Sequence, residues 1–184
     1  TGGTLTATAF APLIASGQKN WIKSFSLLAT ALEYTDVGEI GVYMDTPYMR
    51  QRAKLLKDGG VMPARELAAA FTALKPTDLV WSNVVNNYLK GKDPFPFDLL
   101  YWNSDSTRMP AAMHSFYLRS MYQNNLLSRP GGIELDGVPI DLTKVKTPTF
   151  ILSTREDHIA PWKATYVATQ LYSGPVQFVL AASG

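Results

Sequence analysis

The stretch TPTFILSTREDHIAPWKATYVATQLYSGPVQFVLA, residues 147–181, decides the fold. It opens with a short apolar run, 147–153, of the length of a buried strand, with Pro148 tolerated at the first strand position. A helical segment from Pro161 to Tyr172 follows, with proline in its first turn. The run 175–181 is again apolar and short. Strand, helix and strand at these lengths predict a parallel sheet covered by helices.

The amino-terminal part of the chain predicts a helix and one more strand. Residues 1–17 begin with a glycine pair and continue as an Ala-rich apolar segment that stops at Gly17. This pattern indicates a turn followed by a buried helix with a glycine stop, kinked at Pro12, which lacks a backbone N–H. The apolar run within 24–34 predicts a strand that ends near Thr35-Asp36.

The residues between these strands are too many for an ordinary crossover connection. Residues 92–106 are aromatic and broken by prolines, and 133–148 contain an Asp-Gly turn between short alternating runs, which indicates a hairpin. The stretches with a helical pattern are 46–60, 63–91 and 110–127. We therefore predict one α/β domain with a core formed by 1–35 and 131–184 and an inserted helical cap, 36–130.

Composition excludes several classes of protein. The chain has 184 residues, is 46% hydrophobic and 17% charged, and carries a net charge of +2, which is typical of a folded domain without a nucleic-acid groove. It contains no Cys, which excludes disulfides and thiolate metal sites. No apolar run approaches the roughly 18 residues of a membrane span, and no signal peptide opens the chain, so a cytoplasmic location is expected. A start at Thr1 without Met, and an end directly after a strand, lead us to expect a cut fragment.

One loop carries candidate chemistry. Asp157 and His158 directly follow the strand at 147–153, and an acid in this place orients a catalytic histidine in α/β-hydrolases. Their triads run in the order nucleophile, acid, histidine, and the nucleophile occupies a G-x-nucleophile-x-G elbow. Thr1-Gly2-Gly3-Thr4 fits the second half of such an elbow. A histidine delivered by the strand 175–181 would then lie just beyond Gly184.

Four stretches resemble the poly(3-hydroxyalkanoate) synthases, especially the class I enzymes. They are TGGT (1–4), DLVWSNVVNNYLKGKDPFPFDLLYWNSDSTRMP (78–110), REDHIAPW (155–162) and FVLAASG (178–184). The resemblance covers essentially the whole chain, and the long central motif is much more specific than a triad pattern. It implies a truncated catalytic-domain fragment of an α/β-hydrolase fold with a large helical cap insertion.

The resemblance also implies the chemistry. The family uses a Cys-Asp-His triad to polymerise (R)-3-hydroxyacyl-coenzyme A into polyester, with release of coenzyme A. Asp157 matches the catalytic Asp, the family's Cys falls one residue before Thr1, and its His one residue after Gly184. The backbone N–H of Thr1 is the implied oxyanion donor. No cofactor and no metal are expected. A homodimer at the surface of cytoplasmic polyester granules is implied, and the fragment by itself is expected to be inactive.

Other roles compete for several residues. Asp157 also fits a helix N-cap, and His158 fits either a site lining or a structural hydrogen bond. Asp36 is a rival acid, for which we favour a turn role. His114 is expected to be packed or on the surface. The cap aromatics fit an acyl channel or a dimer contact, but most are expected to form cap core; they are Trp81, Tyr88, Phe95, Phe97, Tyr101, Trp102, Phe116 and Tyr117.

Two other functions remain open. One is an α/β-hydrolase esterase or polyester depolymerase with a serine nucleophile outside the fragment. The other is a non-catalytic binding domain that never had a triad. The residue before Thr1 discriminates between the enzymes, since cysteine favours a synthase and serine a hydrolase.

Overall fold

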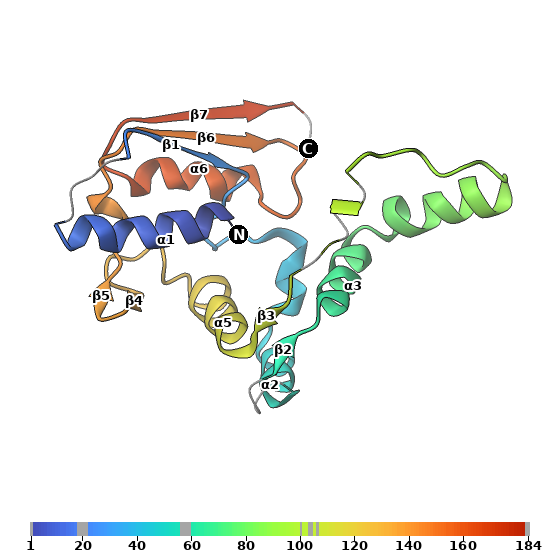
Figure 1. The fold of residues 1–184 in the computed structure, drawn as a ribbon, viewed down its shortest axis with the longest axis horizontal. Coiled ribbons are helices and arrows are strands. Elements are labelled where there is room, and N and C mark those ends of the chain that lie inside the picture. The colour runs from blue at the N-terminus through green and yellow to red at the C-terminus, as the bar shows by residue number, and fades with distance from the viewer. Residues whose placement is uncertain are drawn as a thin grey trace. The chain divides into compact units, whose positions relative to one another are not determined.

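The computed structural model describes residues 2–17, 22–55, 60–99, 101–102, 105 and 107–182. They divide into two compact units, which we call the sheet unit and the helical unit (Figure 1). The sheet unit comprises Thr1–Asp45 and Phe116–Gly184, and the helical unit comprises Thr46–Ser115. Residues 36–45 and 116–130, which the sequence placed in the insertion, group with the sheet unit.

The sheet unit is built on three parallel strands in the order β1-β6-β7. The strands are β1 (Phe25–Leu28), β6 (Thr149–Thr154) and β7 (Val176–Ala181). The prediction of a parallel sheet is confirmed, and the predicted runs 147–153 and 175–181 supply two of its strands. Since parallel strands point the same way, the loops after β1 and β6 leave the same edge of the sheet (Figure 1).

Two helices pack on one face of this sheet. In α1 (Gly2–Ala15), Ala7, Phe10 and Ala11 are buried, a spacing that places them on one side of the helix. The rings of Phe10 and Phe25 meet edge to face with centroids 5.6 Å apart. Helix α6 (Trp162–Leu171) covers β7 from the same side, and its Tyr166 ring lies 5.0 Å from that of Phe178. The expected helices at 1–17 and 161–172 are therefore present.

The ends of α1 and β1 differ in how well the sequence predicted them. Helix α1 runs through Pro12 and is followed by Gly17 at φ +70°, as the expected glycine stop requires. Strand β1 ends at Leu28, well before the predicted end near Thr35-Asp36. Ala29 has φ +46°, which breaks the extended backbone. Behind this turn Leu32 is fully buried, so the second half of the apolar run packs in the core instead of extending the strand.

The predicted hairpin is also present. Strand β4 (Glu134–Leu135) pairs antiparallel with β5 (Val138–Pro139). Asp136 and Gly137 between them have φ +50° and +75°, as a two-residue turn with two left-handed positions requires. The remaining helical segments of the sheet unit are the 3₁₀ turns Gly38–Tyr43 and Leu142–Lys144 and the π-helical Tyr117–Gln123.

The helical unit follows the predicted helical pattern but exposes its aromatic residues. Its elements are α2 (Thr46–Leu55), β2 (Val61–Met62), α3 (Ala64–Leu74), the π-helical segments Thr77–Trp81 and Val84–Leu89, β3 (Met109–Pro110) and α5 (Ala111–Phe116). The exposed fractions are Trp81 60%, Tyr88 83%, Phe95 84%, Phe97 51%, Tyr101 86% and Trp102 72%. Phe116, which belongs to the sheet unit, is 39% exposed. The expectation that most of these residues form cap core is wrong. Helix α3 and the π-helical segments Thr77–Trp81 and Val84–Leu89 contain no buried residue.

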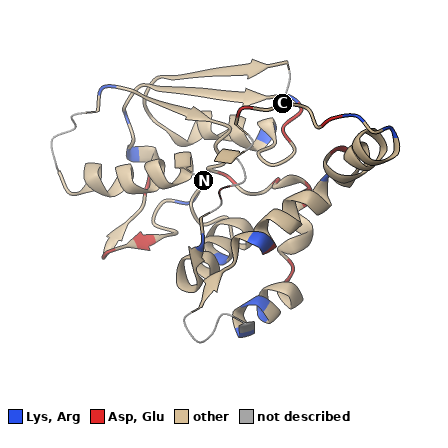
Figure 2. Ribbon diagram, turned by 45° about the vertical axis from the view of Figure 1, so that its right-hand side comes forward, with Lys and Arg blue, Asp and Glu red and all other residues tan. Residues whose placement is uncertain are grey.

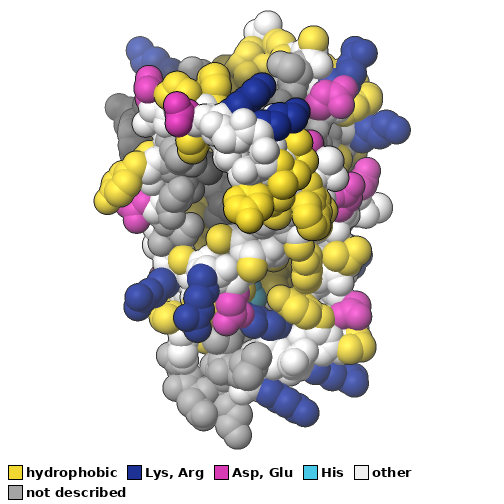
Figure 3. Space-filling view, turned by 90° about the vertical axis from the view of Figure 1, so that its right-hand side faces the viewer, with side chains coloured by type: hydrophobic (Ala, Val, Ile, Leu, Met, Phe, Trp, Pro, Cys, Tyr) yellow, Lys and Arg dark blue, Asp and Glu magenta, His cyan; other side chains and the backbone are white. Residues whose placement is uncertain are grey.

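Hydrophobic and charged side chains are distributed differently over the surface (Figure 2 and Figure 3). Exposed hydrophobic side chains gather in one area of the face shown in Figure 3. Basic and acidic residues are scattered over the ribbon in Figure 2. Within the described ranges, no helix combines the length and the apolar character that crossing a membrane requires.

Candidate active site

Asp157 lies in the loop between β6 and α6, and its side chain organises that loop. Its Oδ1 accepts hydrogen bonds from the backbone N–H groups of Ile159 and Ala160, each over 2.9 Å. The carboxylate is partly buried. No described residue donates a hydrogen bond to its Oδ2. One oxygen is thus held by the backbone, while the other has no donor from the described part of the chain.

The acid loop, residues 155–161, contacts the turn that follows β1. At Gly38, which has φ +65°, an added Cβ would lie 2.7 Å from the carbonyl oxygen of His158 and 3.2 Å from Pro161 Cγ. This close approach, together with the left-handed backbone, requires glycine. The imidazole of His158 is partly buried and makes no hydrogen bond to a described residue. His158 therefore contributes its backbone carbonyl to the packing of the loop.

Asp36 holds the turn on the other side of this contact. Its Oδ1 accepts a hydrogen bond from the N–H of Gly38 over 3.1 Å, and its side chain is exposed. Because β1 ends at Leu28, Asp36 does not follow a strand directly. The geometry of Asp36 is that of a turn residue.

The amino end of α1 lies against the segment that follows β1. A Cβ on Gly3 would lie 2.0 Å from Oγ1 and 2.6 Å from Cγ2 of Thr30. Thr4 Oγ1 donates to the carbonyl oxygen of Ala31 over 2.9 Å. Thr1, the expected oxyanion donor, lies outside the described residues. The structure therefore brings together the start of α1, the segment after β1 and the acid loop at the carboxyl edge of the sheet.

Sequence reasoning missed a polar pair beside this edge, the buried Glu33 and the partly buried Asn125. Glu33 is only 9% exposed, and its Oε1 accepts hydrogen bonds from Asn125 Nδ2 and from the backbone of Thr35. An acid inside the apolar run ATALEY was the available signal. Its partner is 92 positions away, so no local pattern identifies it.

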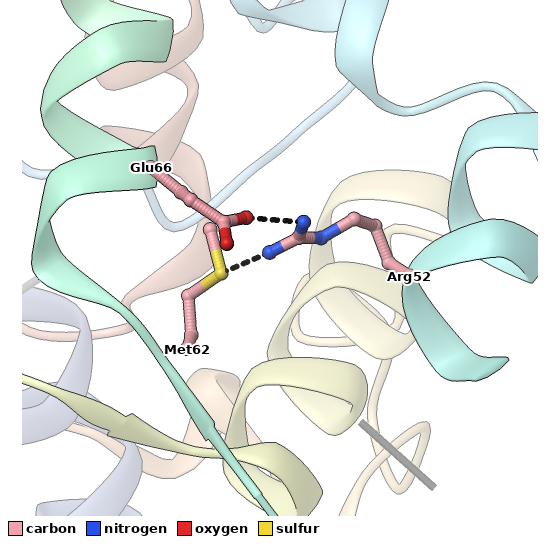
Figure 4. A network of polar contacts seen from close by, with 3 residues as sticks. All are labelled: Arg52, Met62 and Glu66. Carbon is pink, nitrogen blue, oxygen red and sulfur yellow. Dashed lines mark hydrogen bonds and ion pairs between the residues drawn. The ribbon is translucent and has the colours of Figure 1, made fainter. Parts of the chain in front are cut away.

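His114 belongs to the helical unit and is packed rather than exposed. It is 6% exposed, and burial together with the positive charge of Arg52 lowers its pKa, while Glu66 opposes that shift. Arg52 forms an ion pair with Glu66 and donates to the sulfur of Met62 (Figure 4). Within the described residues, no three His, Cys, Asp or Glu side chains gather as they would around a metal ion.

Comparisons with known proteins identify one family. No family model matches the chain. A poly(3-hydroxyalkanoate) polymerase of Methylorubrum extorquens is 46% identical over 183 residues, which cover 100% of this chain and 30% of that protein. The poly(3-hydroxyalkanoate) polymerase subunit PhaC of Cupriavidus necator is 44% identical over 188 residues, and that of Rhizobium meliloti 45% over 183. This chain covers 32% and 30% of those two proteins.

A solved structure, that of mouse alpha/beta hydrolase domain-containing protein 10, aligns at a TM-score of 0.38 and 15% identity, over 99% of this chain and 49% of that one. The sequence relatives decide the family. All of this chain aligns with them, and it spans about a third of their length. The chain therefore belongs, as a segment, to the poly(3-hydroxyalkanoate) polymerase family.

Proposed function

We propose that the intact protein transfers (R)-3-hydroxyacyl groups from coenzyme A to a growing polyester, and that Asp157 is the acid of its Cys-Asp-His triad. The observation that carries the proposal is the match of the whole chain to several poly(3-hydroxyalkanoate) polymerases at 44–46% identity. The cysteine precedes Thr1 and the histidine follows Gly184 in the intact protein. The core that holds them is of the α/β-hydrolase type.

The geometry of Asp157 supports this role. The carboxylate follows a parallel strand at the carboxyl edge, where the parts of such a site converge. The N–H groups of Ile159 and Ala160 hold Oδ1, and this fixes the direction of the carboxyl group. Oδ2 then accepts the Nδ1–H of the histidine. The negative charge orients the imidazole and stabilises the imidazolium that forms when the base takes up a proton.

The reaction runs through an enzyme thioester. The histidine takes the proton of the cysteine thiol, and the thiolate attacks the thioester carbonyl of the substrate. Coenzyme A leaves as its thiol with that proton. The hydroxyl of the second hydroxyacyl group then gives its proton to the imidazole and attacks the acyl-enzyme. An ester bond forms, and the cysteine leaves as its thiol with the same proton.

Cysteine suits this sequence because exchange between two thioesters is nearly thermoneutral. The oxyanion of each tetrahedral intermediate accepts a hydrogen bond from the N–H of Thr1, which follows the nucleophile. Gly3 and Thr4 support this oxyanion site because they fix the start of α1: Gly3 packs closely against Thr30, and Thr4 donates a hydrogen bond to Ala31.

The test extends the chain at both ends to the full-length protein and measures coenzyme A release from (R)-3-hydroxybutyryl-coenzyme A with a thiol reagent. We expect turnover in that protein and none in residues 1–184 alone. Asp157→Asn should reduce kcat by several orders of magnitude, as in other triads. Asp36→Asn is the matched control and should retain most of the activity. A large loss at Asp36 with none at Asp157 would mean that the acid is misassigned, and a serine before Thr1 would favour a hydrolase.

For the helical unit we propose self-association of the intact protein through the exposed aromatic segment near Phe97 and Trp102. These side chains are 51% and 72% exposed, and apolar surface of this kind favours protein contacts. Trp102→Ala should shift sedimentation toward monomer and lengthen the polymerisation lag. Tyr88→Ala, at an 83% exposed position outside this segment, is the control. Unchanged sedimentation and lag in Trp102→Ala would exclude this contact. We place the working enzyme at the granule surface, where its polyester product accumulates.

A further inference from the structure

The segment Thr30–Gly38, which we call the bridge, contacts both parts of the proposed site. Its first residues pack against the amino end of α1, where Thr4 donates to Ala31. Its last residue, Gly38, lies against the carbonyl of His158 in the acid loop. The bridge therefore connects the amino end of α1 with the acid loop.

The middle of the bridge is held by the buried Glu33 and the partly buried Asn125. Asn125 Oδ1 accepts the backbone N–H of Tyr34 over 2.9 Å, and its Nδ2 donates to Oε1 of Glu33. The same Glu33 oxygen accepts the N–H of Thr35 over 3.0 Å and its hydroxyl. One amide side chain thus binds a backbone donor and a carboxylate acceptor of the same segment.

Glu33 is held by hydrogen-bond donors rather than by a cation. No Lys or Arg among the described residues forms an ion pair with Glu33, which is 9% exposed. A buried carboxylate without a cation is stable only when several N–H or O–H groups donate to it. Asn125 is one of these donors, and it tolerates the left-handed φ of +48° that its turn requires.

We propose that Glu33 and Asn125 are positioning residues that hold the bridge and thereby align the acid loop with the start of α1. This inference rests on the proposed function of Asp157. Neither residue touches the reacting atoms. Their contribution to the reaction is the alignment of the triad, for which a displacement of about 1 Å costs on the order of a hundredfold in rate.

The experiment exchanges the donor and the acceptor in the full-length protein. Asn125→Asp places a second carboxylate beside Glu33 and removes the donor, so kcat for coenzyme A release should fall by about tenfold to a hundredfold. The KM for the acyl-coenzyme A and the circular dichroism spectrum should remain unchanged. Adding Glu33→Gln restores one donor and one acceptor, and this double variant should recover most of the lost kcat. Glu33→Gln alone keeps an acceptor and should stay within about threefold of the parent, which is less than 1 kcal/mol.

Two further variants separate positioning from folding. Asn125→Gly keeps the left-handed backbone without strain and removes only the amide, so its kcat should also fall about tenfold in a folded protein. Asp141→Ala is the control, because Asp141 holds a comparable turn before β6. Its Oδ1 accepts hydrogen bonds from the N–H of Thr143 over 3.0 Å and from the hydroxyl of Thr143 over 2.6 Å. It should leave kcat unchanged.

The outcomes distinguish this inference from the proposed function. If Asn125→Asp and Asn125→Gly fold and keep the kcat of the parent, the positioning role is wrong. It is also wrong if the Asn125→Asp, Glu33→Gln double variant folds but does not recover the kcat that Asn125→Asp loses. If the parent releases coenzyme A and Asp157→Asn does not, the proposed function survives either result. If Asp157→Asn is as active as the parent, the triad assignment itself fails.

Discussion

Replacement of Gly3 tests the packing on which the start of α1 depends. A Cβ at this position would lie 2.0, 2.6 and 2.9 Å from Oγ1, Cγ2 and Cβ of Thr30. Thr30 is only 2% exposed, and its hydroxyl donates to the Leu28 carbonyl, so its side chain has little room to move. Gly3→Ala therefore forces the amino end of α1 away from the bridge.

Gly2 supplies the matched control for the magnitude. Nothing lies within 4 Å of a Cβ at Gly2. Both replacements gain the helix propensity of Ala, up to about 1 kcal/mol, so the difference between them isolates the clash. Overpacking of this kind costs about 1–3 kcal/mol. With an m-value of about 2 kcal/mol/M, a difference of about 2 kcal/mol separates the urea midpoints by about 1 M.

The assay is urea unfolding of the two variants of this chain, followed by circular dichroism. A second check adds Thr30→Ala to Gly3→Ala, which removes the two atoms nearest to the new methyl group. This pair should show a coupling free energy of about 1 kcal/mol or more. Equal midpoints for Gly2→Ala and Gly3→Ala, or the absence of coupling with Thr30, would refute the packing at this position.

Further predictions concern groups buried elsewhere. Burial raises the pKa of Tyr34, Tyr122 and Tyr172 above the ordinary 10.0, so the folded state keeps them protonated. The contribution of these three neutral hydroxyls to the free energy of unfolding is complete below pH 10.0 and is lost as the pH rises above it. Absorbance at alkaline pH should therefore show the three tyrosines ionising only as the sheet unit unfolds. In the helical unit, Glu66→Ala should cost more stability than Arg52→Ala, about 3 against about 1 kcal/mol, measured by thermal unfolding. The reason is that Arg52 is 11% exposed and would remain as an unpaired buried charge, whereas Glu66 at 39% can be hydrated; equal losses would contradict this.

Local patterns in the sequence were sufficient to predict most strands and helices of the sheet unit. The apolar runs 147–153 and 175–181, with a helical segment between them, specify two parallel strands and their crossover. The Asp136-Gly137 pair specifies the hairpin, because both positions adopt left-handed φ angles that favour these residue types. The loop that carries Asp157 follows directly from the strand that precedes it.

The end of β1 depended on the tertiary structure. The run within 24–34 is mostly apolar, and periodicity does not show where a strand stops and core packing begins. Leu32 is fully buried in the hydrophobic core once the chain turns at Ala29. For the same reason Asp36 does not follow a strand, although its place in the sequence suggested it.

The exposure of the cap aromatics and the pairing of Glu33 with Asn125 were likewise decided in three dimensions. Aromatic content indicates a core only where other elements cover it, and the described helices of that unit leave Trp102 exposed. Glu33 and Asn125 are 92 positions apart, and each by itself has the appearance of an ordinary surface or turn residue. Only the folded chain brings the carboxylate and the amide together. A buried carboxylate needs hydrogen-bond donors beside it, and Asn125 supplies one.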